Sequence, residues 1–266
     1  DIQRGTTILH KGCRLRAQDI GLAASIGLQT LPVYEPLKVG MFFTGDELVE
    51  PGQKLGVGKI YDSNRYTLHG LLESMGCEII DLGLVGDTLA ATSEAMVRAS
   101  TQADLVVTTG GVSVGEEDHV RIAMEQLGEL RLWRLAIKPG KPLAYGQINE
   151  TAFIGLPGNP VSVFATFCLL VCPVIQTLQG RDWHEPISLP VKADFDWPKP
   201  DSRREFLRAR LALDANGQTV AQIYPNQDSG VLTSTVWADG FVEIAENQTV
   251  QAGESVNYLP FAQFFS

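Results

Sequence analysis

Between residues 37 and 185 the hydrophobic positions alternate between short continuous apolar runs and longer amphipathic segments. The runs predict buried strands, and the segments with apolar residues three and four positions apart predict helices. The predicted strands are 39–43, 78–83, 105–108, 130–137 and a hairpin over 143–154, and the predicted helices are 63–75, 89–99, 120–127 and 161–179. Apolar strands that alternate with helices are typical of parallel sheets. We therefore predict an α/β domain over 37–185, with a mostly parallel sheet and helices on both faces.

The pattern changes after residue 185. Short β segments separated by turn signals, such as the Asn-Gly pair at 216–217, predict a small all-β C-terminal domain over 186–266. Its predicted strands are 189–193, 204–213, 219–224, 240–245 and 255–258. Residues 1–36 hold too few apolar side chains to close a core alone, so we interpret them as the tail of a truncated N-terminal domain.

The composition excludes a disordered chain, because 44% of the 266 residues are hydrophobic and 20% are charged. The 21 Lys and Arg residues against 31 Asp and Glu residues give a formal net charge of −10. An acidic surface repels nucleic acid and anionic lipid, so we expect neither nucleic acid nor a membrane as a partner. An anionic substrate would need cations gathered locally in a cleft.

The cysteines and histidines give no sign of a metal site or of a disulfide framework. The four cysteines are scattered without a C-x-x-C pair, and the four histidines lack metal-ligand spacing. The apolar run at 161–175 contains Pro173 and suits a buried core helix better than a membrane span. Without a visible signal peptide, we expect a cytoplasmic protein with buried, reduced cysteines.

In parallel α/β folds, ligands bind beyond the carboxyl ends of the strands, and a glycine-rich segment occupies such a place here. The segment TTGGVSVGEED (108–118) lies between a predicted strand and a predicted helix. Gly110, Gly111 and Gly115 would let backbone amides approach an anion closely. A tight turn that needs positive φ is the simpler interpretation, but Ser113 and Asp118 add polar groups that a turn does not require.

A second candidate is the segment LPGNPVS at 156–162. Asn159 suits an N-cap and Pro160 a first helical residue, so the segment is partly explained as a helix start. The functional alternative is a helix terminus that holds an oxyanion near Pro157 and Gly158, with Ser162 donating a hydrogen bond.

A third candidate is a group of cations in the segment RLAIKPGKP at 134–142. Arg134 and Lys138 are an even number of residues apart, so on one strand both would point to the same face. Together with Lys141 they suit multiply charged oxyanions. A solvated surface run is the alternative interpretation.

Carboxylates at predicted strand ends form a fourth candidate: Asp46, Glu47, Asp87 and Asp118. Mg²⁺ prefers oxygen ligands and is usually bound through one or two carboxylates together with substrate phosphates. Each carboxylate alone suits a cap or a turn, but we expect them to converge on one edge of the sheet.

Five motifs together resemble the proteins of molybdenum cofactor biosynthesis. They are TGDEL (44–48), IYDSNR (60–65), TGGVSVGE (109–116), IKPGKP (137–142) and GLPGNPVS (155–162). With the β domain that follows, the chain is similar to the molybdopterin molybdenumtransferase family, which includes MoeA and the gephyrin E domain. The Gly-Gly loop alone is less specific, because molybdopterin adenylyltransferases share it.

The resemblance implies a reaction in which adenylylated molybdopterin and molybdate give molybdenum cofactor and AMP, with Mg²⁺ as the cofactor. It also implies roles for individual residues. The molybdate pocket would be formed by Lys138, Lys141, Ser162, Arg208 and Ser229, with Arg134 nearby. Asp118 would act with the metal and the diphosphate, and Asp46, Glu47 and Asp87 would line the cleft. Asp87, Asp118, Lys138 and Lys141 are the candidate catalytic residues, and the two Gly/Pro loops would bind substrate.

Family members carry a substantial region before the point that corresponds to Asp1, and the resemblance implies that this region contributes to a homodimer. A contact with molybdopterin adenylyltransferase is a further expected partner interaction. Two alternatives stay open: adenylyltransferase activity, which the extra β domain disfavours, and a non-catalytic pterin-binding module.

Overall fold

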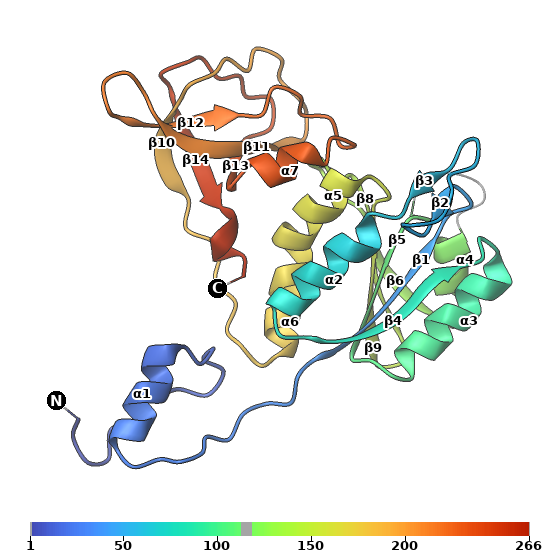
Figure 1. Ribbon diagram of the computed structural model, residues 1–266, viewed down its shortest axis with the longest axis horizontal. Coiled ribbons are helices and arrows are strands. Elements are labelled where there is room, and N and C mark those ends of the chain that lie inside the picture. The colour runs from blue at the N-terminus through green and yellow to red at the C-terminus, as the bar shows by residue number, and fades with distance from the viewer. Residues whose placement is uncertain (1, 113–118, 266) are drawn as a thin grey trace.

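The computed structural model describes residues 2–112 and 119–265 and contains two six-stranded sheets. An α/β layer and a β layer lie side by side, and the N-terminal residues run along one end (Figure 1). The first sheet has the order β4-β1-β5-β9-β8-β6. Its strands are β1 (Lys38–Thr44), β4 (Glu78–Val85), β5 (Leu105–Thr109), β6 (Gly128–Arg134), β8 (Pro142–Ile148) and β9 (Thr151–Leu156). The first four in the order are parallel and the last two pairings are antiparallel, so the predicted mostly parallel sheet is confirmed.

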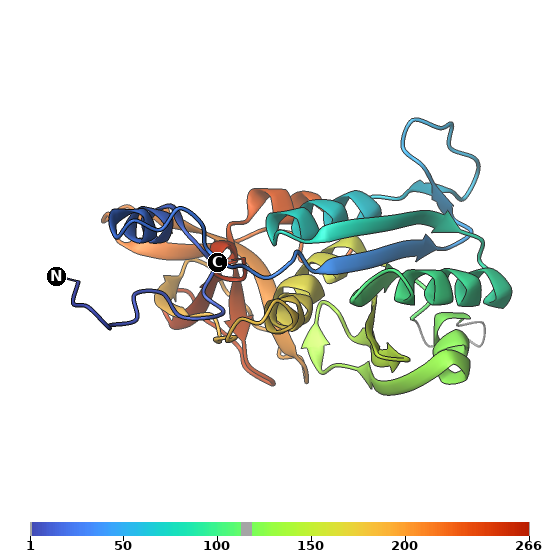
Figure 2. The same cartoon turned by 90° about the horizontal axis from the view of Figure 1, so that it is seen from below.

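Helices cover both faces of this sheet, as predicted. They are α2 (Asn64–Ser74), α3 (Leu89–Ser100), α4 (His119–Leu127) and a continuous helix made of α5 (Pro160–Thr166), the π-helical turn η1 (Phe167–Val171) and α6 (Cys172–Leu178). Successive strand residues point to opposite faces. Met41 and Phe43 therefore share a core with α2 and α5–α6, whereas Phe42 packs with α3 and α4. Figure 2 shows α2 and α3 on opposite sides of β1 and β4.

The helix over Pro160–Leu178 is long and apolar enough to cross a membrane by length and composition. Within the part of the chain that the structure describes, it is the one helix that passes this test, and 61% of its most apolar window is buried inside the protein. Val163, Phe167 and Ile175 pack in the core, which supports the interpretation as a core helix.

The second sheet is formed mainly by the C-terminal residues, in the order β12-β10-β14-β13-β11-β7. Its strands there are β10 (Leu189–Ala193), β11 (Arg204–Leu213), β12 (Thr219–Ile223), β13 (Gly240–Ile244) and β14 (Ser255–Pro260). An additional pairing of β12 with β11 closes five of them into a small barrel-like sheet. Leu207, Val242 and Tyr258 belong to its own hydrophobic core.

The predicted strand over 130–137 is right only as far as Arg134, because the chain changes sheet beyond that residue. β6 ends at Arg134, and β7 (Ile137–Lys138) pairs with β11 of the second sheet in the register Glu205↔Lys138. Arg134 and Lys138 therefore do not share one face of one strand. The turn that follows is tight: Gly140 has φ +111°, and a Cβ there would lie 2.4 Å from the Thr166 Cγ2 atom. Because β6 belongs to the first sheet and β7 to the second, the segment 134–142 links the two sheets.

The N-terminal residues add little to either core. Their one helix among the described residues, α1 (Ala17–Ser25), buries Asp19 and Ala23. It was not predicted, nor were the short pair β2 (Leu48–Val49) and β3 (Ile60–Tyr61), α7 (Thr233–Trp237) or the 3₁₀ turn η2 (Phe261–Gln263). The four cysteines are free thiols, as predicted, but only Cys168 and Cys172 are buried, whereas Cys77 is partly exposed and Cys13 is exposed.

Candidate functional site

The candidate residues gather where the strands of the first sheet end. β1, β4, β5 and β9 run in one direction, so the residues that follow them lie at one edge of the sheet. β6 runs in that direction as well, and β8 runs against it. Asp46, Glu47, Asp87, Gly110, Gly111, Arg134, Lys141 and Pro157–Pro160 thus all lie at or next to this edge, as the sequence predicted. Ser113, Gly115 and Asp118 lie outside the described residues.

The Gly-Gly loop fits closely against the end of β1. Gly110 has φ +82° and Gly111 has φ +60°, which is the left-handed region that glycine tolerates best. A Cβ on Gly110 would lie 2.6 Å from the Thr44 carbonyl oxygen. The Gly110 amide donates to the Leu156 carbonyl at 3.3 Å. Gly110 and Gly111 therefore form the tight turn with positive φ that the sequence analysis considered. This turn brings the ends of β1, β5 and β9 together.

The PGNP loop joins the first sheet to the second. Pro160 is the first residue of α5, as predicted, but the Asn159 side chain does not cap the helix. Instead, Asn159 Nδ2 donates to Ser229 Oγ at 2.8 Å, and the Val161 amide donates to the Ser229 carbonyl at 3.0 Å. Ser162 is buried in the first turn of the helix. Two residues that the resemblance assigned to one pocket, Ser162 and Ser229, are thus brought together from different domains.

Asn64 is a contact residue that the sequence analysis missed as a site residue. It begins α2, is buried, and its Nδ2 atom donates to the Gly158 carbonyl at 2.8 Å, with Thr109 Oγ1 at 3.5 Å. Asn64 therefore bridges the Gly-Gly loop and the PGNP loop. Its Oδ1 atom is buried without a partner among the described residues. Asn64 lies in the motif IYDSNR (60–65), which carries part of the family resemblance but to which the sequence analysis assigned no chemical role.

Asp62, two positions earlier, is also buried. Its Oδ1 atom accepts a hydrogen bond from the Arg65 amide at 3.1 Å, while Oδ2 has no partner among the described residues. Burial raises the pKa of the Asp62 carboxyl, against the opposing effect of that hydrogen bond. Unpaired buried acceptors are rare in native proteins. The partnerless oxygens of Asp62 and Asn64 are therefore an unusual feature of the segment that leads into α2.

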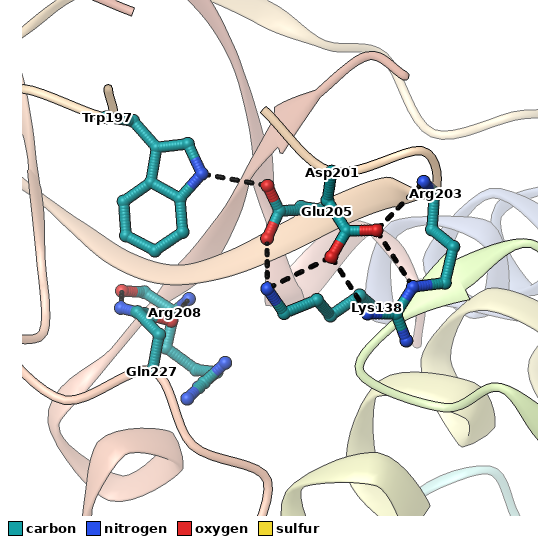
Figure 3. Close-up of polar contacts among 7 residues, drawn as sticks. All are labelled: Lys138, Trp197, Asp201, Arg203, Glu205, Arg208 and Gln227. Carbon is teal, nitrogen blue, oxygen red and sulfur yellow. Dashed lines mark hydrogen bonds and ion pairs between the residues drawn. The ribbon is translucent and has the colours of Figure 1, made fainter. Parts of the chain in front are cut away.

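Lys138 lies between two carboxylates at the junction of the sheets (Figure 3). Its Nζ atom is 2.8 Å from Glu205 Oε1 and 3.3 Å from Asp201 Oδ2. Burial disfavours the ammonium, but the hydrogen bonds and charges of Glu205 and Asp201 outweigh it, so the pKa of Lys138 is raised. Arg203 pairs with Asp201 at 2.8 Å, and this contact lowers the pKa of the Asp201 carboxyl. The four charges sum to zero.

The other two cations of this segment are exposed. Arg134 is opposite Pro142 in the β6–β8 pairing, and the Leu135 amide donates to the Lys141 carbonyl at 2.9 Å. Arg134 and Lys141 are therefore held near the same strand ends while their side chains reach solvent.

Arg208 is 1% exposed and is one of the largest fully buried side chains. It donates to Ser234 Oγ at 3.0 Å and to the carbonyl oxygens of Asp228 at 3.1 Å and Asn226 at 3.5 Å, all uncharged acceptors. Burial lowers the pKa of the Arg208 guanidinium to about 10, although the Asp228 charge opposes this. These bonds shape the loop that carries Ser229.

The carboxylates at the edge are not arranged as a metal cage. Asp87 accepts a hydrogen bond from Thr44 Oγ1 at 2.8 Å, and Asp46 and Glu47 are exposed. In the described ranges, no group of three or more His, Cys, Asp or Glu side chains could hold a metal ion.

Two family models match this chain. Residues 40–177 match the family described as "Probable molybdopterin binding domain", and residues 190–261 match "MoeA C-terminal region (domain IV)". The first match covers the sheet edge with both Gly/Pro loops, and the second covers most of the barrel-like sheet.

Individual relatives agree with these matches. The molybdopterin molybdenumtransferase of Haemophilus influenzae is 41% identical over 98% of this chain, which spans 65% of that protein's length. The molybdenum cofactor synthesis protein cinnamon of Drosophila melanogaster is 35% identical over 88% of this chain and 39% of its own length. The solved structure of the molybdopterin biosynthesis moeA protein of Pyrococcus horikoshii has a TM-score of 0.79 and 28% identity, covering 97% of this chain and 63% of that one. The chain therefore belongs to the molybdopterin-binding domain family and combines that domain with a MoeA-type C-terminal domain.

Proposed function

We propose that this chain forms the substrate-holding part of a molybdopterin molybdenumtransferase. The reaction is the transfer of molybdenum from molybdate to adenylylated molybdopterin, which gives molybdenum cofactor and AMP. The names of the Haemophilus, Nostoc and Bacillus subtilis relatives support this assignment. The chain spans 50–65% of the length of those proteins, so the activity of the whole protein is part of the proposal.

The buried Arg208 guanidinium is the observation that carries the proposal. A buried charge is costly unless it is paired, and the acceptors that hold Arg208 are uncharged. Its loop presents Ser229 to Asn159 and Val161 at the start of α5, next to the buried Ser162. A dianion such as molybdate suits a pocket with this chemistry.

The remaining candidate residues take roles that fit their positions. Lys138, Lys141, Ser162, Arg208 and Ser229 would bind molybdate, with Arg134 nearby. The loops at Gly110–Gly111 and Pro157–Pro160 would bind the phosphates of the pterin substrate through backbone groups. Asp46, Glu47 and Asp87 would line the cleft, and Asp118, outside the described residues, would act on the diphosphate.

Mg²⁺ is part of the proposal as the cofactor. The described carboxylates fit a cation that is held chiefly by substrate phosphates, because Mg²⁺ commonly keeps only one or two protein carboxylates. Asp118, outside the described residues, would be such a ligand, with Asp87 lining the cleft, and the bound ion would neutralise charge on the diphosphate. Asp87 itself is oriented by the Thr44 hydroxyl at 2.8 Å.

The proposal also includes a homodimer, a cytoplasmic location and a contact with molybdopterin adenylyltransferase. These follow from the family resemblance. Size-exclusion chromatography with light scattering, and pull-down with a purified adenylyltransferase, test the two interactions.

The test of the proposed reaction is molybdate-dependent release of AMP from adenylylated molybdopterin in the presence of Mg²⁺, using the protein as its gene encodes it. Arg208→Met keeps the apolar stem but removes the charge, so we expect the KM for molybdate to rise at least tenfold. ATP-dependent adenylylation of molybdopterin would instead indicate an adenylyltransferase. Binding of molybdopterin without turnover would indicate a non-catalytic module.

A further inference from the structure

Glu205 is the buried half of an ion pair between two neighbouring strands of the second sheet, β11 and β7. It lies on β11, is 1% exposed, and is directly opposite Lys138 of β7 in the strand register. The Lys138 side chain is 41% exposed, so one partner is fixed in the protein interior while the other reaches the site. Asp201, which precedes β11, makes the second and longer contact to the same ammonium.

The donors of the Lys138 ammonium can be counted. A lysine ammonium has three N–H groups and accepts no hydrogen bond. Its nitrogen lies 2.8 Å from Glu205 Oε1 and 3.3 Å from Asp201 Oδ2 as ion pairs, although Glu205 Oε1 has no hydrogen bond of good geometry among the described residues. The two carboxylates can engage at most two N–H groups, so at least one remains for an acceptor outside this cluster, and the two carboxylates restrict its direction.

The environment of Glu205 demands a carboxylate. Its second oxygen, Oε2, accepts a hydrogen bond from the Trp197 indole N–H at 2.8 Å. An indole N–H and an ammonium can only donate, so position 205 must present two acceptors. Figure 3 shows the two donors on different oxygens of Glu205. A glutamine would turn its NH₂ group toward one of them, and this mismatch would be buried.

We propose that Glu205 is a positioning residue that holds Lys138 with its third N–H directed at the bound oxyanion, and that Asp201 is a weaker second support. This inference rests on the proposed function. It differs from a simple electrostatic interpretation, in which Glu205 only competes with the oxyanion for the lysine.

The two interpretations predict opposite changes for Glu205→Gln. This variant removes one negative charge, so mere competition predicts a lower KM for molybdate. Positioning predicts a KM for molybdate that is about tenfold higher, a factor equivalent to about 1.4 kcal/mol. The KM for adenylylated molybdopterin stays unchanged, because the Gly/Pro loops that bind its phosphates do not depend on Lys138.

Two further variants separate positioning from a general structural defect. In Glu205→Gln with Trp197→Phe the indole donor is gone, so the glutamine oxygen can turn to Lys138, and we expect most of the lost molybdate affinity to return. Glu243→Gln is the matched control: Glu243 lies on β13 of the same sheet and pairs with Arg204 at 3.1 Å, so the same charge change there should leave the KM for molybdate unaltered.

Asp201→Asn tests the same proposal if Glu205→Gln fails to fold. Asp201 lies outside the strand and is partly exposed, so its substitution should disturb folding less. We expect about a threefold rise in the KM for molybdate. An unchanged or lower KM in both single variants, or the absence of rescue by Trp197→Phe, would overturn the proposal.

A readout without turnover keeps this inference distinct from the proposed function. In selectively labelled protein, NMR titration of the Lys138 side chain should give a higher pKa in the wild type than in Glu205→Gln. If the wild type releases no AMP, the proposed function fails, and the NMR titration still tests the Glu205–Lys138 contact. Identical titration curves in the two proteins would show that Glu205 does not hold Lys138.

Discussion

The two sheets contribute to the candidate site in different ways. The first sheet contributes loops whose backbone is fixed by glycine and proline, such as Gly110 and Pro160. The second sheet contributes charged side chains, Glu205 and Arg208, which are fixed by partners far away in the sequence. The backbone loops are neutral and sterically constrained, whereas the side-chain cluster around Lys138 depends on a balance of charges.

This difference determines how each half of the site can fail. A loop with left-handed φ has no alternative conformation open to a larger residue, so a substitution there displaces the backbone itself. A charged side chain that loses a partner can move without displacing the strand that carries it. We therefore expect a substitution at a left-handed glycine of the first sheet's loops to have a larger effect than a change around Lys138.

Gly110→Ala should have the largest effect. The added Cβ would lie 2.6 Å from the Thr44 carbonyl oxygen, in a residue with φ +82°. We expect the free energy of unfolding to fall by about 2–4 kcal/mol. Molybdate-dependent AMP release should fall about a hundredfold, because the strand ends that position substrate are displaced. Urea unfolding and the AMP assay measure the two effects.

Gly70→Ala is the control for this change. Gly70 lies on the exposed side of α2, and a Cβ there meets no atom within 4 Å. Alanine favours the helix, so a gain of about 0.5–1 kcal/mol in unfolding free energy is expected, with normal activity. Equal behaviour of the two variants would mean that the Gly-Gly loop is not constrained as described.

Lys138→Ala should have the next largest effect. It leaves the buried Glu205 carboxylate without its cation and removes the donor that we propose for molybdate. We expect a KM for molybdate about thirtyfold higher and a loss of about 2 kcal/mol in unfolding free energy, less than for a fully buried pair because Lys138 is partly exposed. Both quantities are measured with the same assay and with urea unfolding.

Arg203→Ala removes the other cation of the same cluster and provides the comparison. Arg203 pairs with Asp201, whose side chain is more exposed than that of Glu205, so a loss of about 0.5–1 kcal/mol is expected. If Arg203→Ala were as damaging as Lys138→Ala, the buried contact with Glu205 would not be the dominant one.

The sequence predicted the loops better than the charged cluster, for a physical reason. Gly110, Gly111 and Pro160 act through their own backbone, so their local order along the chain indicates their geometry. The convergence of Asp46 and Asp87 on one edge also followed from the parallel strand order.

Contacts between distant segments could not be predicted in this way. Lys138 appeared to share a strand face with Arg134, but its partner strand is β11, more than sixty residues later. The Glu205 and Trp197 contacts to this cluster, and the Asn159 contact to Ser229, depend on how the two sheets pack. Asn64 was missed because a single polar residue at a helix start is explained equally well as a cap.

Asn64→Ala tests the bridge within the first sheet's loops. The variant removes the 2.8 Å hydrogen bond from the buried Asn64 side chain and leaves the Gly158 carbonyl without that donor. We expect a loss of about 1–2 kcal/mol in unfolding free energy and about a fivefold lower kcat/KM for the pterin substrate. Steady-state kinetics with each substrate varied in turn measures the effect.

Asn159→Ala removes the corresponding amide contact between the sheets, at 2.8 Å to Ser229 Oγ. Asn159 is exposed, so water replaces the lost bond and a smaller loss of stability is expected. The kinetic effect should appear in the KM for molybdate rather than for the pterin. The same kinetic change in both variants would show that the two loops act as one unit.

The smallest expected effect is the dependence of stability on pH through Asp201. The hydrogen bond from Arg203 holds the pKa of this carboxyl below its ordinary value near 4, so the ionised form is favoured in the folded protein. Its stabilising contribution is therefore complete above about pH 5 and is lost as the pH falls from there through the folded-state pKa. The wild type should exceed Asp201→Asn in unfolding free energy at pH 6, and the difference should shrink steadily toward pH 2. Because Arg203 is the stronger cause, Arg203→Ala should flatten this difference more than Lys138→Ala does. A difference that stays constant from pH 6 to pH 2 would show that Asp201 is not held by its charge, and would leave Glu205 as the sole carboxylate that fixes Lys138.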